Sequence, residues 1–214
     1  MSAPVVAASD LVGGGDTIVA QATPPGRGAI AVVRVSGPRA HALCRAMAST
    51  WPAAPRVATL AMLHDESGAP IDQAIVTRYD APASFTGEDM VELSTHGGAV
   101  VPVTVIAALI ARGARQALPG EYTRRALLNG KLDILQAEAV GDLVEATSRA
   151  AQRVALRQLD GGLSRRILAL RDAIIAVEAL VAYDIDFPEE DDGPIPPERV
   201  SAASARVIHD LSAL

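Results

Sequence analysis

The sequence predicts an α+β domain followed by an all-helical segment, and three observations support this prediction. Short runs rich in Val, Ile and Thr alternate with helical patterns up to about residue 130, which is typical of a sheet with associated helices. From Lys131 onward apolar residues recur at helical spacing, and no proline interrupts them before Pro188. Half of the residues are hydrophobic but only 3% are aromatic, so the core must be aliphatic and alanine-rich, which favours packed helices.

The first domain is expected over residues 16–130, after a glycine-rich and flexible tail at 1–15. Strands are predicted at 17–23 and 29–36, which are rich in Val, Ile and Thr, and also at 59–64, 71–79, 90–95 and 115–118. Helices are predicted at 38–50, 100–112 and 121–128. Pro38 suits the first turn of the first helix, and Asn129-Gly130 is a C-cap signal for the last.

The second part, residues 131–214, is expected to be helical throughout. Gly161-Gly162 is predicted to divide it into two long helices, which end at the acidic, proline-rich "DFPEEDDGPIPPE". A further amphipathic helix is predicted over 198–214. Two or three such helices do not bury their apolar faces alone, so we expect these residues to form only the first part of a helical domain.

Composition excludes several classes of protein. The net charge is −6, and a domain that binds nucleic acid by itself usually has a basic excess, so any RNA contact requires a local basic patch or a partner. The single cysteine, Cys44, rules out an intramolecular disulfide and a Cys-rich metal site, and its helical, apolar context predicts a core thiol. No signal peptide and no apolar run long enough to span a membrane is found, which predicts a soluble, cytoplasmic protein.

Two charged residues stand within apolar strands. Arg34 alternates with Ile30 and Val32, and Glu92 lies similarly in "DMVELSTHGG". They are either solvent-facing charges on separate strands or the walls of one polar cleft, in which Arg34 offers a planar fork of donors and Glu92 a pair of acceptors. Spacing alone leaves both interpretations open.

The other polar motifs give weaker indications of function than Arg34 and Glu92 do. Lys131 lies between two predicted helices, where a solvated junction lysine is the plain interpretation. His96 precedes Gly97-Gly98 and has the position of a turn or capping residue as much as that of a catalyst. The loop "TPPGRG" is not a phosphate-binding P-loop, because G-x-x-x-x-G-K-[ST] is absent, and "DFPEEDD" lacks the pattern of a calcium loop. No catalytic or metal-binding residue is therefore predicted, and no GTP hydrolysis is expected from these residues.

Four stretches together resemble the MnmE (TrmE) family of tRNA modification GTPases. They are "DTIVAQATPPGRGAIAVVRVSG", "SFTGEDMVELSTHGG", "PGEYTRRALLNGKLDILQAEAVGDLVEA" and "DFPEEDD", which occur in the family's order between Asp16 and about Asp192. The resemblance implies an N-terminal domain similar to the folate domain of the glycine-cleavage T-protein, followed by a helical domain. It also implies a Ras-like G domain beyond these residues, which alone would use GTP, Mg²⁺ and K⁺.

The resemblance further implies what the domains bind. The cofactor would be a tetrahydrofolate derivative, 5-formyl- or 5,10-methylene-tetrahydrofolate, and the family's folate contacts correspond to Arg34, Glu92 and Lys131. The implied partners are a second copy through the N-terminal domain, the flavoprotein MnmG, and tRNA, which receives an aminomethyl-type group on carbon 5 of the wobble uridine.

Two other functions remain possible on the sequence. One is a non-catalytic dimerisation or docking module with a vestigial folate pocket. The other is a freestanding aminomethyltransferase-like folate enzyme, which is disfavoured because the helical segment resembles the MnmE family and not a freestanding T-protein.

Overall fold

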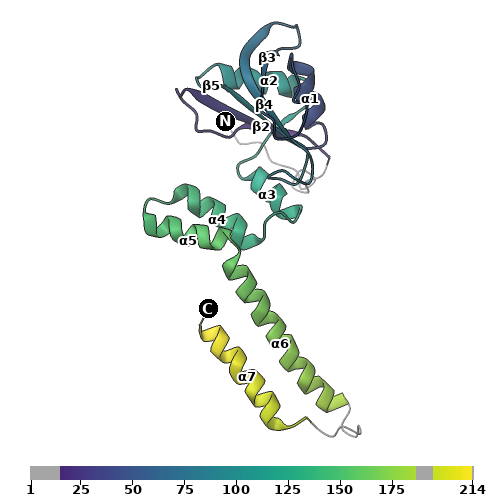
Figure 1. The fold of residues 1–214 in the computed structure, drawn as a ribbon, viewed down its shortest axis with the longest axis vertical. Helices are drawn as coiled ribbons and strands as arrows, with labels where there is room; N and C mark the ends of the chain where they lie inside the picture. Colours follow the sequence, from purple (N-terminus) through teal and green to yellow (C-terminus); the bar gives the residue numbers. More distant parts are fainter. Residues whose placement is uncertain (1–14, 187–194, 214) are drawn as a thin grey trace, which may run out of the picture. The chain divides into compact units, whose positions relative to one another are not determined.

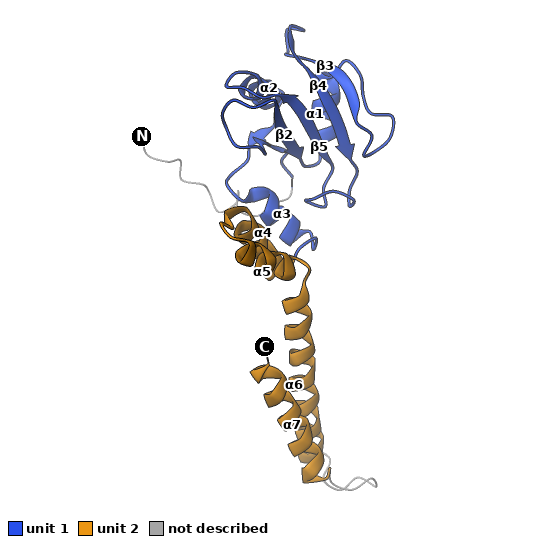
Figure 2. Cartoon of the chain, turned by 60° about the vertical axis from the view of Figure 1, so that its left-hand side comes forward, with its two compact units in different colours: residues 1–132 blue, residues 133–214 orange. Residues whose placement is uncertain are grey.

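The computed structural model describes residues 15–186 and 195–213 (Figure 1). The tail expected at the N-terminus and most of the acidic, proline-rich stretch therefore lie outside the described residues. The chain divides into two compact units, Met1–Leu132 and Asp133–Leu214 (Figure 2). The first combines a sheet with helices and the second contains helices only in its described part, which confirms the predicted fold class.

A six-stranded sheet forms the first unit, in the order β3-β4-β5-β2-β1-β6. All neighbours are antiparallel except β1 and β6, which pair in parallel. The strands are β1 (Ile18–Gln21), β2 (Ile30–Ser36), β3 (Thr59–His64), β4 (Pro70–Tyr79), β5 (Met90–His96) and β6 (Arg115–Gln116). The predicted strands are confirmed within a few residues at their ends.

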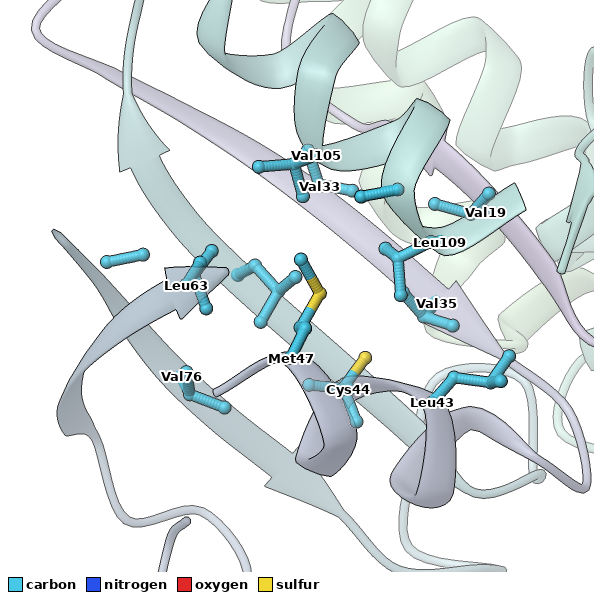
Figure 3. Close-up of a cluster of buried hydrophobic side chains, with 14 of the residues drawn as sticks. Val19, Val33, Val35, Leu43, Cys44, Met47, Leu63, Val76, Val105 and Leu109 are labelled. Carbon is cyan, nitrogen blue, oxygen red and sulfur yellow. The ribbon is translucent and has the colours of Figure 1, made fainter. Parts of the chain in front are cut away.

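The hydrophobic core lies between one face of this sheet and two helices, α1 (Ala40–Met47) and α2 (Val101–Ala111). Strand residues such as Val33 and Leu63 meet Met47 of α1 and Leu109 of α2 there (Figure 3). Cys44 belongs to the same cluster and is fully buried, which confirms the prediction of a core thiol; burial raises the pKa of its thiol.

The opposite face of the sheet is only half-buried, because successive side chains of a strand point to opposite sides. The half-buried positions alternate with core positions along β2, β4 and β5: Val32, Arg34, Ile75, Thr77, Glu92 and Ser94. The third helix of this unit, α3 (Glu121–Leu128), reaches this face through Tyr122, whose hydroxyl donates a hydrogen bond to the carbonyl oxygen of Arg34. Arg34 and Glu92 are therefore outside the core and on one common face.

The described part of the second unit contains α4 (Ile134–Glu145), α5 (Arg149–Leu159), α6 (Gly162–Asp186) and α7 (Pro197–Ser212). The break at Gly161-Gly162 is confirmed, and Gly161 adopts a left-handed φ of 71°. The prediction of one long helix before that break was wrong, because the chain turns at residues 146–148. Ser148 is extended and its side chain accepts a hydrogen bond from the backbone N–H of Ala151, so it caps the start of a new helix.

Helices α6 and α7 pack side by side (Figures 1 and 2). Much of their apolar surface nevertheless stays exposed, as at Ile174, Ile175 and Ile208. This agrees with the expectation that these helices do not bury their apolar faces by themselves. Among the described residues, no helix is long and apolar enough to cross a membrane.

Gly37 follows β2 at a position that admits no side chain, and Gly37→Ala is expected to destabilise the protein. Its φ is 129°, and a Cβ atom would lie 2.5 Å from the carbonyl oxygen of Asp16 and 2.8 Å from the Cα of Thr17. Because both neighbours are backbone atoms, we expect the free energy of unfolding to fall by more than about 1 kcal/mol. Urea denaturation measures this change.

The matched control is Gly98→Ala, since no atom lies within 4 Å of the added Cβ at that position. Its effect should stay within about 0.5 kcal/mol. Equal stability of the two variants would contradict the steric argument at Gly37.

Candidate functional site

Arg34 and Glu92 stand directly opposite each other on β2 and β5 and form an ion pair. The Nη2 and Nε atoms of Arg34 both donate to Oε1 of Glu92, at 2.7 and 3.0 Å. The two side chains are 25% and 22% exposed, so they are neither free surface charges nor sealed in the core. Of the two interpretations left open by the sequence, the structure favours one polar site built from two strands.

Aromatic side chains surround this pair. The rings of Phe85 and Tyr122 lie 5.3 and 5.7 Å from the guanidinium carbon of Arg34. The hydroxyl of Tyr79 donates to Oε2 of Glu92 at 3.2 Å. Three of the six Phe, Tyr and Trp residues of the sequence thus gather at one site, a concentration that sequence analysis missed. The sequence feature that could have drawn attention to these residues is that aromatic residues are scarce in this chain.

The pair keeps hydrogen-bonding capacity for a ligand. Nη1 of Arg34 makes no hydrogen bond among the described residues, and Oε2 of Glu92 receives only the bond from Tyr79. Burial, followed by the charge of Glu92, raises the pKa of the Tyr79 hydroxyl, so that hydroxyl remains a donor at neutral pH. The site therefore offers a cationic donor, an anionic acceptor and aromatic faces, which suits a flat heterocycle with polar edges.

Among the described residues, no hydrogen bond or ion pair joins Lys131 to Arg34 or Glu92. Its Nζ atom donates to the carbonyl oxygen of Pro82 at 3.1 Å, in the loop of residues 80–89 between β4 and β5. The same loop carries Phe85, which lies beside Arg34, so this loop connects Lys131 to the ion pair. Its stem also packs beside Gly87, where an added Cβ would lie 3.2 Å from the Cγ of Lys131.

Hydrogen bonds tie the 80–89 loop to β2 and to the end of α3. The hydroxyls of Ser36 and the fully buried Thr86 lie 2.7 Å apart. The side-chain amide of Asn129 donates to the carbonyl oxygen of Thr86 at 2.7 Å, and Ser84 donates to that of Glu88. These bonds hold Phe85 in position against Arg34.

A buried ion-pair network anchors this loop. Arg125 of α3 is 1% exposed and pairs with Asp16, Glu88 and Glu121, at 2.5, 3.2 and 3.1 Å. Arg115 adds a second guanidinium, which lies 2.6 Å from Glu121. Sequence analysis missed this network. The one available signal was the four-residue spacing of Glu121 and Arg125, which any helix can show.

Opposing effects set the ionisation of these carboxyl groups. Burial by itself would raise the pKa of Glu121, but hydrogen bonds from Arg115, the Leu118 backbone and Arg125 outweigh burial and lower it. Asp16 behaves in the same way, because Arg115 and Arg125 outweigh its partial burial. Both groups are carboxylates at neutral pH, as the buried cation of Arg125 requires.

His96 fits the turn interpretation. It ends β5, and its backbone N–H and Nδ1 meet the two carboxylate oxygens of Asp72, at 2.8 and 2.7 Å. No group of three or more His, Cys, Asp and Glu side chains able to hold a metal ion occurs among the described residues.

Comparison with known proteins identifies relatives over nearly the whole chain. The family model described as "GTP-binding protein TrmE N-terminus" matches residues 17–131, and that described as "MnmE helical domain" matches residues 134–214. Proteins named "tRNA modification GTPase MnmE" are 53% identical over 176 residues in Azoarcus sp. (strain BH72) and 50% identical over 175 residues in Neisseria meningitidis serogroup A. The chain is 43% identical to that of Legionella pneumophila (strain Paris) over 196 residues.

These alignments cover 82%, 82% and 92% of this chain, respectively. They cover only 39%, 39% and 44% of the three relatives, so the chain spans about two fifths of their length.

Replacing Arg125 by methionine should strongly destabilise the first unit. The change leaves the buried carboxylate of Glu121 without one of its two cationic partners and removes the cationic partner of Glu88. Breaking a buried pair from one side costs about 3–5 kcal/mol. Thermal and urea unfolding measure the loss. The control is Arg171→Met, which removes an exposed pair with Asp172 and should cost at most about 1 kcal/mol. Equal losses would show that the network does not anchor the unit.

Proposed function

This chain belongs to the MnmE (TrmE) family of tRNA modification GTPases, and from this premise we propose that its first unit binds a tetrahydrofolate derivative. The observation that carries the proposal is the half-buried Arg34–Glu92 pair, with Phe85, Tyr79 and Tyr122 around it. The pair, together with Lys131, corresponds to the residues for which the family resemblance implies folate contacts.

The chemistry of a reduced folate supports this assignment. A pterin presents an amide and amino edge, whose N–H groups suit the carboxylate of Glu92, and a flat ring, which suits the aromatic faces. The glutamyl tail is anionic, and both Arg34 and Lys131 supply positive charge to the same loop region. The folate would carry the one-carbon unit, either 5-formyl- or 5,10-methylene-tetrahydrofolate, while these residues bind and orient it.

The same proposal includes an activity for the whole protein, which we take from the family resemblance. With the flavoprotein MnmG, it would add an aminomethyl-type group to carbon 5 of the wobble uridine of certain tRNAs in the cytoplasm. GTP, Mg²⁺ and K⁺ would act in a G domain outside these residues, because the chain contains no G-x-x-x-x-G-K-[ST] motif. The second candidate, a docking module with a vestigial pocket, predicts no folate binding.

Glu92→Gln is the sharpest test of folate binding, because it keeps the shape of the side chain and removes its charge. Loss of a charge-assisted hydrogen bond costs roughly 1.5–3 kcal/mol, so the dissociation constant of 5-formyltetrahydrofolate should rise about ten- to a hundredfold. Isothermal calorimetry measures it, and a thermal melt of each variant verifies folding.

Glu66→Gln makes the same chemical change on an exposed turn and is the matched control. It should bind like the wild type, and Arg34→Ala should bind as weakly as Glu92→Gln. Equal affinities of the wild type, Arg34→Ala and Glu92→Gln would favour the docking module.

We also propose that the first unit forms a homodimer through the half-buried face of its sheet. Ile30 and Leu60 lie on this face and are 63% and 54% exposed, which leaves apolar surface for a second copy beside the Arg34 site. Sedimentation velocity at micromolar concentration should give a dimer for the wild type and a monomer for Leu60→Glu. Val144→Glu, at an exposed position of α4, should remain a dimer. A monomeric wild type would contradict the proposal.

A further inference from the structure

Three arginines follow one another along a single face of α5. Arg149, Arg153 and Arg157 are spaced by four residues, so each lies about 6 Å along the helix axis from the next and on the same side. All three are exposed. The helix therefore carries a continuous cationic stripe over about two turns.

The segment of the sequence that contains this stripe has a charge opposite to that of the whole chain. Residues 146–171 contain six arginines and a single acidic residue, Asp160, while the whole chain has a net charge of −6. Such a segment is the local basic patch that an acidic protein needs in order to bind a polyanion.

Folding does not explain the stripe. The side chains of Arg149, Arg153 and Arg157 make no hydrogen bond or ion pair with any described residue, in contrast to those of Arg34 and Arg125 of the first unit. Arg149 also occupies the first turn of α5, which has no acidic residue, and the helix dipole disfavours a cation there. The position of Arg149 and the repulsion between like charges four residues apart lower the stability of the isolated helix, whereas Arg157 lies in the last turn, where the dipole favours a cation.

The stripe continues into a hollow in the second unit. Arg157 lines this hollow together with Arg165 and Arg166 from the first turns of α6. Arg165 and Arg166 donate to the backbone carbonyl oxygens of Asp160 and Ala213, which orients their guanidinium groups without neutralising them. Asp160 is the single carboxylate among the lining residues, so the hollow keeps a positive charge.

We propose that Arg149, Arg153, Arg157, Arg165 and Arg166, the arginine patch, bind the phosphate backbone of RNA. Planar guanidinium groups match phosphate geometry, and a regular row of them suits a row of phosphates better than the scattered carboxylates of a protein. No aromatic residue occurs from 146 to 171, so the patch holds backbone and does not stack bases. The inference rests on the proposed function, which makes tRNA the RNA concerned.

The test compares two triple variants of the full 214-residue chain. Arg149, Arg153 and Arg157 are replaced together by glutamine in the first, which keeps a high helix propensity. Arg171, Arg199 and Arg206 are replaced in the same way in the second, so the same charge is lost from the same unit outside the patch. Fluorescence anisotropy with a labelled tRNA transcript measures binding between about 50 and 200 mM KCl.

The patch variant should bind tRNA at least about tenfold more weakly at low salt. The slope of log affinity against log salt should fall in magnitude by about 2, because each lost phosphate contact contributes roughly 0.7–0.9. The second variant should stay close to the wild type in both quantities. Polyglutamate should not displace tRNA from the wild type.

Three results would overturn the proposal: no tRNA binding by the wild type, equal weakening in both variants, or displacement of tRNA by polyglutamate, which would indicate an acidic protein partner. Calorimetry of the patch variant with 5-formyltetrahydrofolate shows whether only the RNA-binding proposal fails or the proposed folate function fails as well. If the patch variant binds both folate and tRNA as strongly as the wild type, the RNA-binding role of the arginine patch is refuted and the proposed folate function stands.

Discussion

The architecture of the first unit depends on the need to neutralise one buried cation. The guanidinium of Arg125 lies inside the protein, where an unpaired charge costs several kcal/mol, and it is compensated by carboxylates from three separate segments. Asp16 precedes β1, Glu88 lies near the end of the loop between β4 and β5, and Glu121 begins α3. Their common partner fixes the positions of these segments relative to one another.

The candidate site follows from this arrangement. Glu88 belongs to the loop that carries Phe85, and Arg125 belongs to the helix that carries Tyr122, so the network places both rings beside Arg34. The ion pair itself sits on two hydrogen-bonded strands of the central sheet, which hold it more rigidly than loops would. A site assembled in this way is ordered before any ligand arrives, which reduces the entropy lost on binding.

The two units use arginine in different ways. In the first unit, Arg34, Arg115 and Arg125 each pair with a carboxylate, so their charges are neutralised within the fold. In the second unit, the arginines of α5 have no partner among the described residues, and their charge remains available to the surroundings. An acidic chain can therefore present a cationic surface without a basic composition, because the distribution of charge matters more than its sum.

The sequence by itself determined the elements whose pattern is local. Runs rich in Val and Ile located β1 and β2, and helical periodicity with the Asn129-Gly130 cap located α3. Gly161 marked a break because its left-handed φ suits glycine. The alternation along β2 and β5 also predicted that Arg34 and Glu92 lie outside the core.

Only the tertiary structure decided that they pair with each other, since strand register depends on contacts between residues 58 positions apart in sequence. The split between α4 and α5 was missed because Ala146-Thr147-Ser148 is compatible with a helix and only the Ser148 cap reveals the turn. The partners of Arg125 lie as far as 109 residues away, and side chains so distant in sequence meet only through the packing of the folded chain.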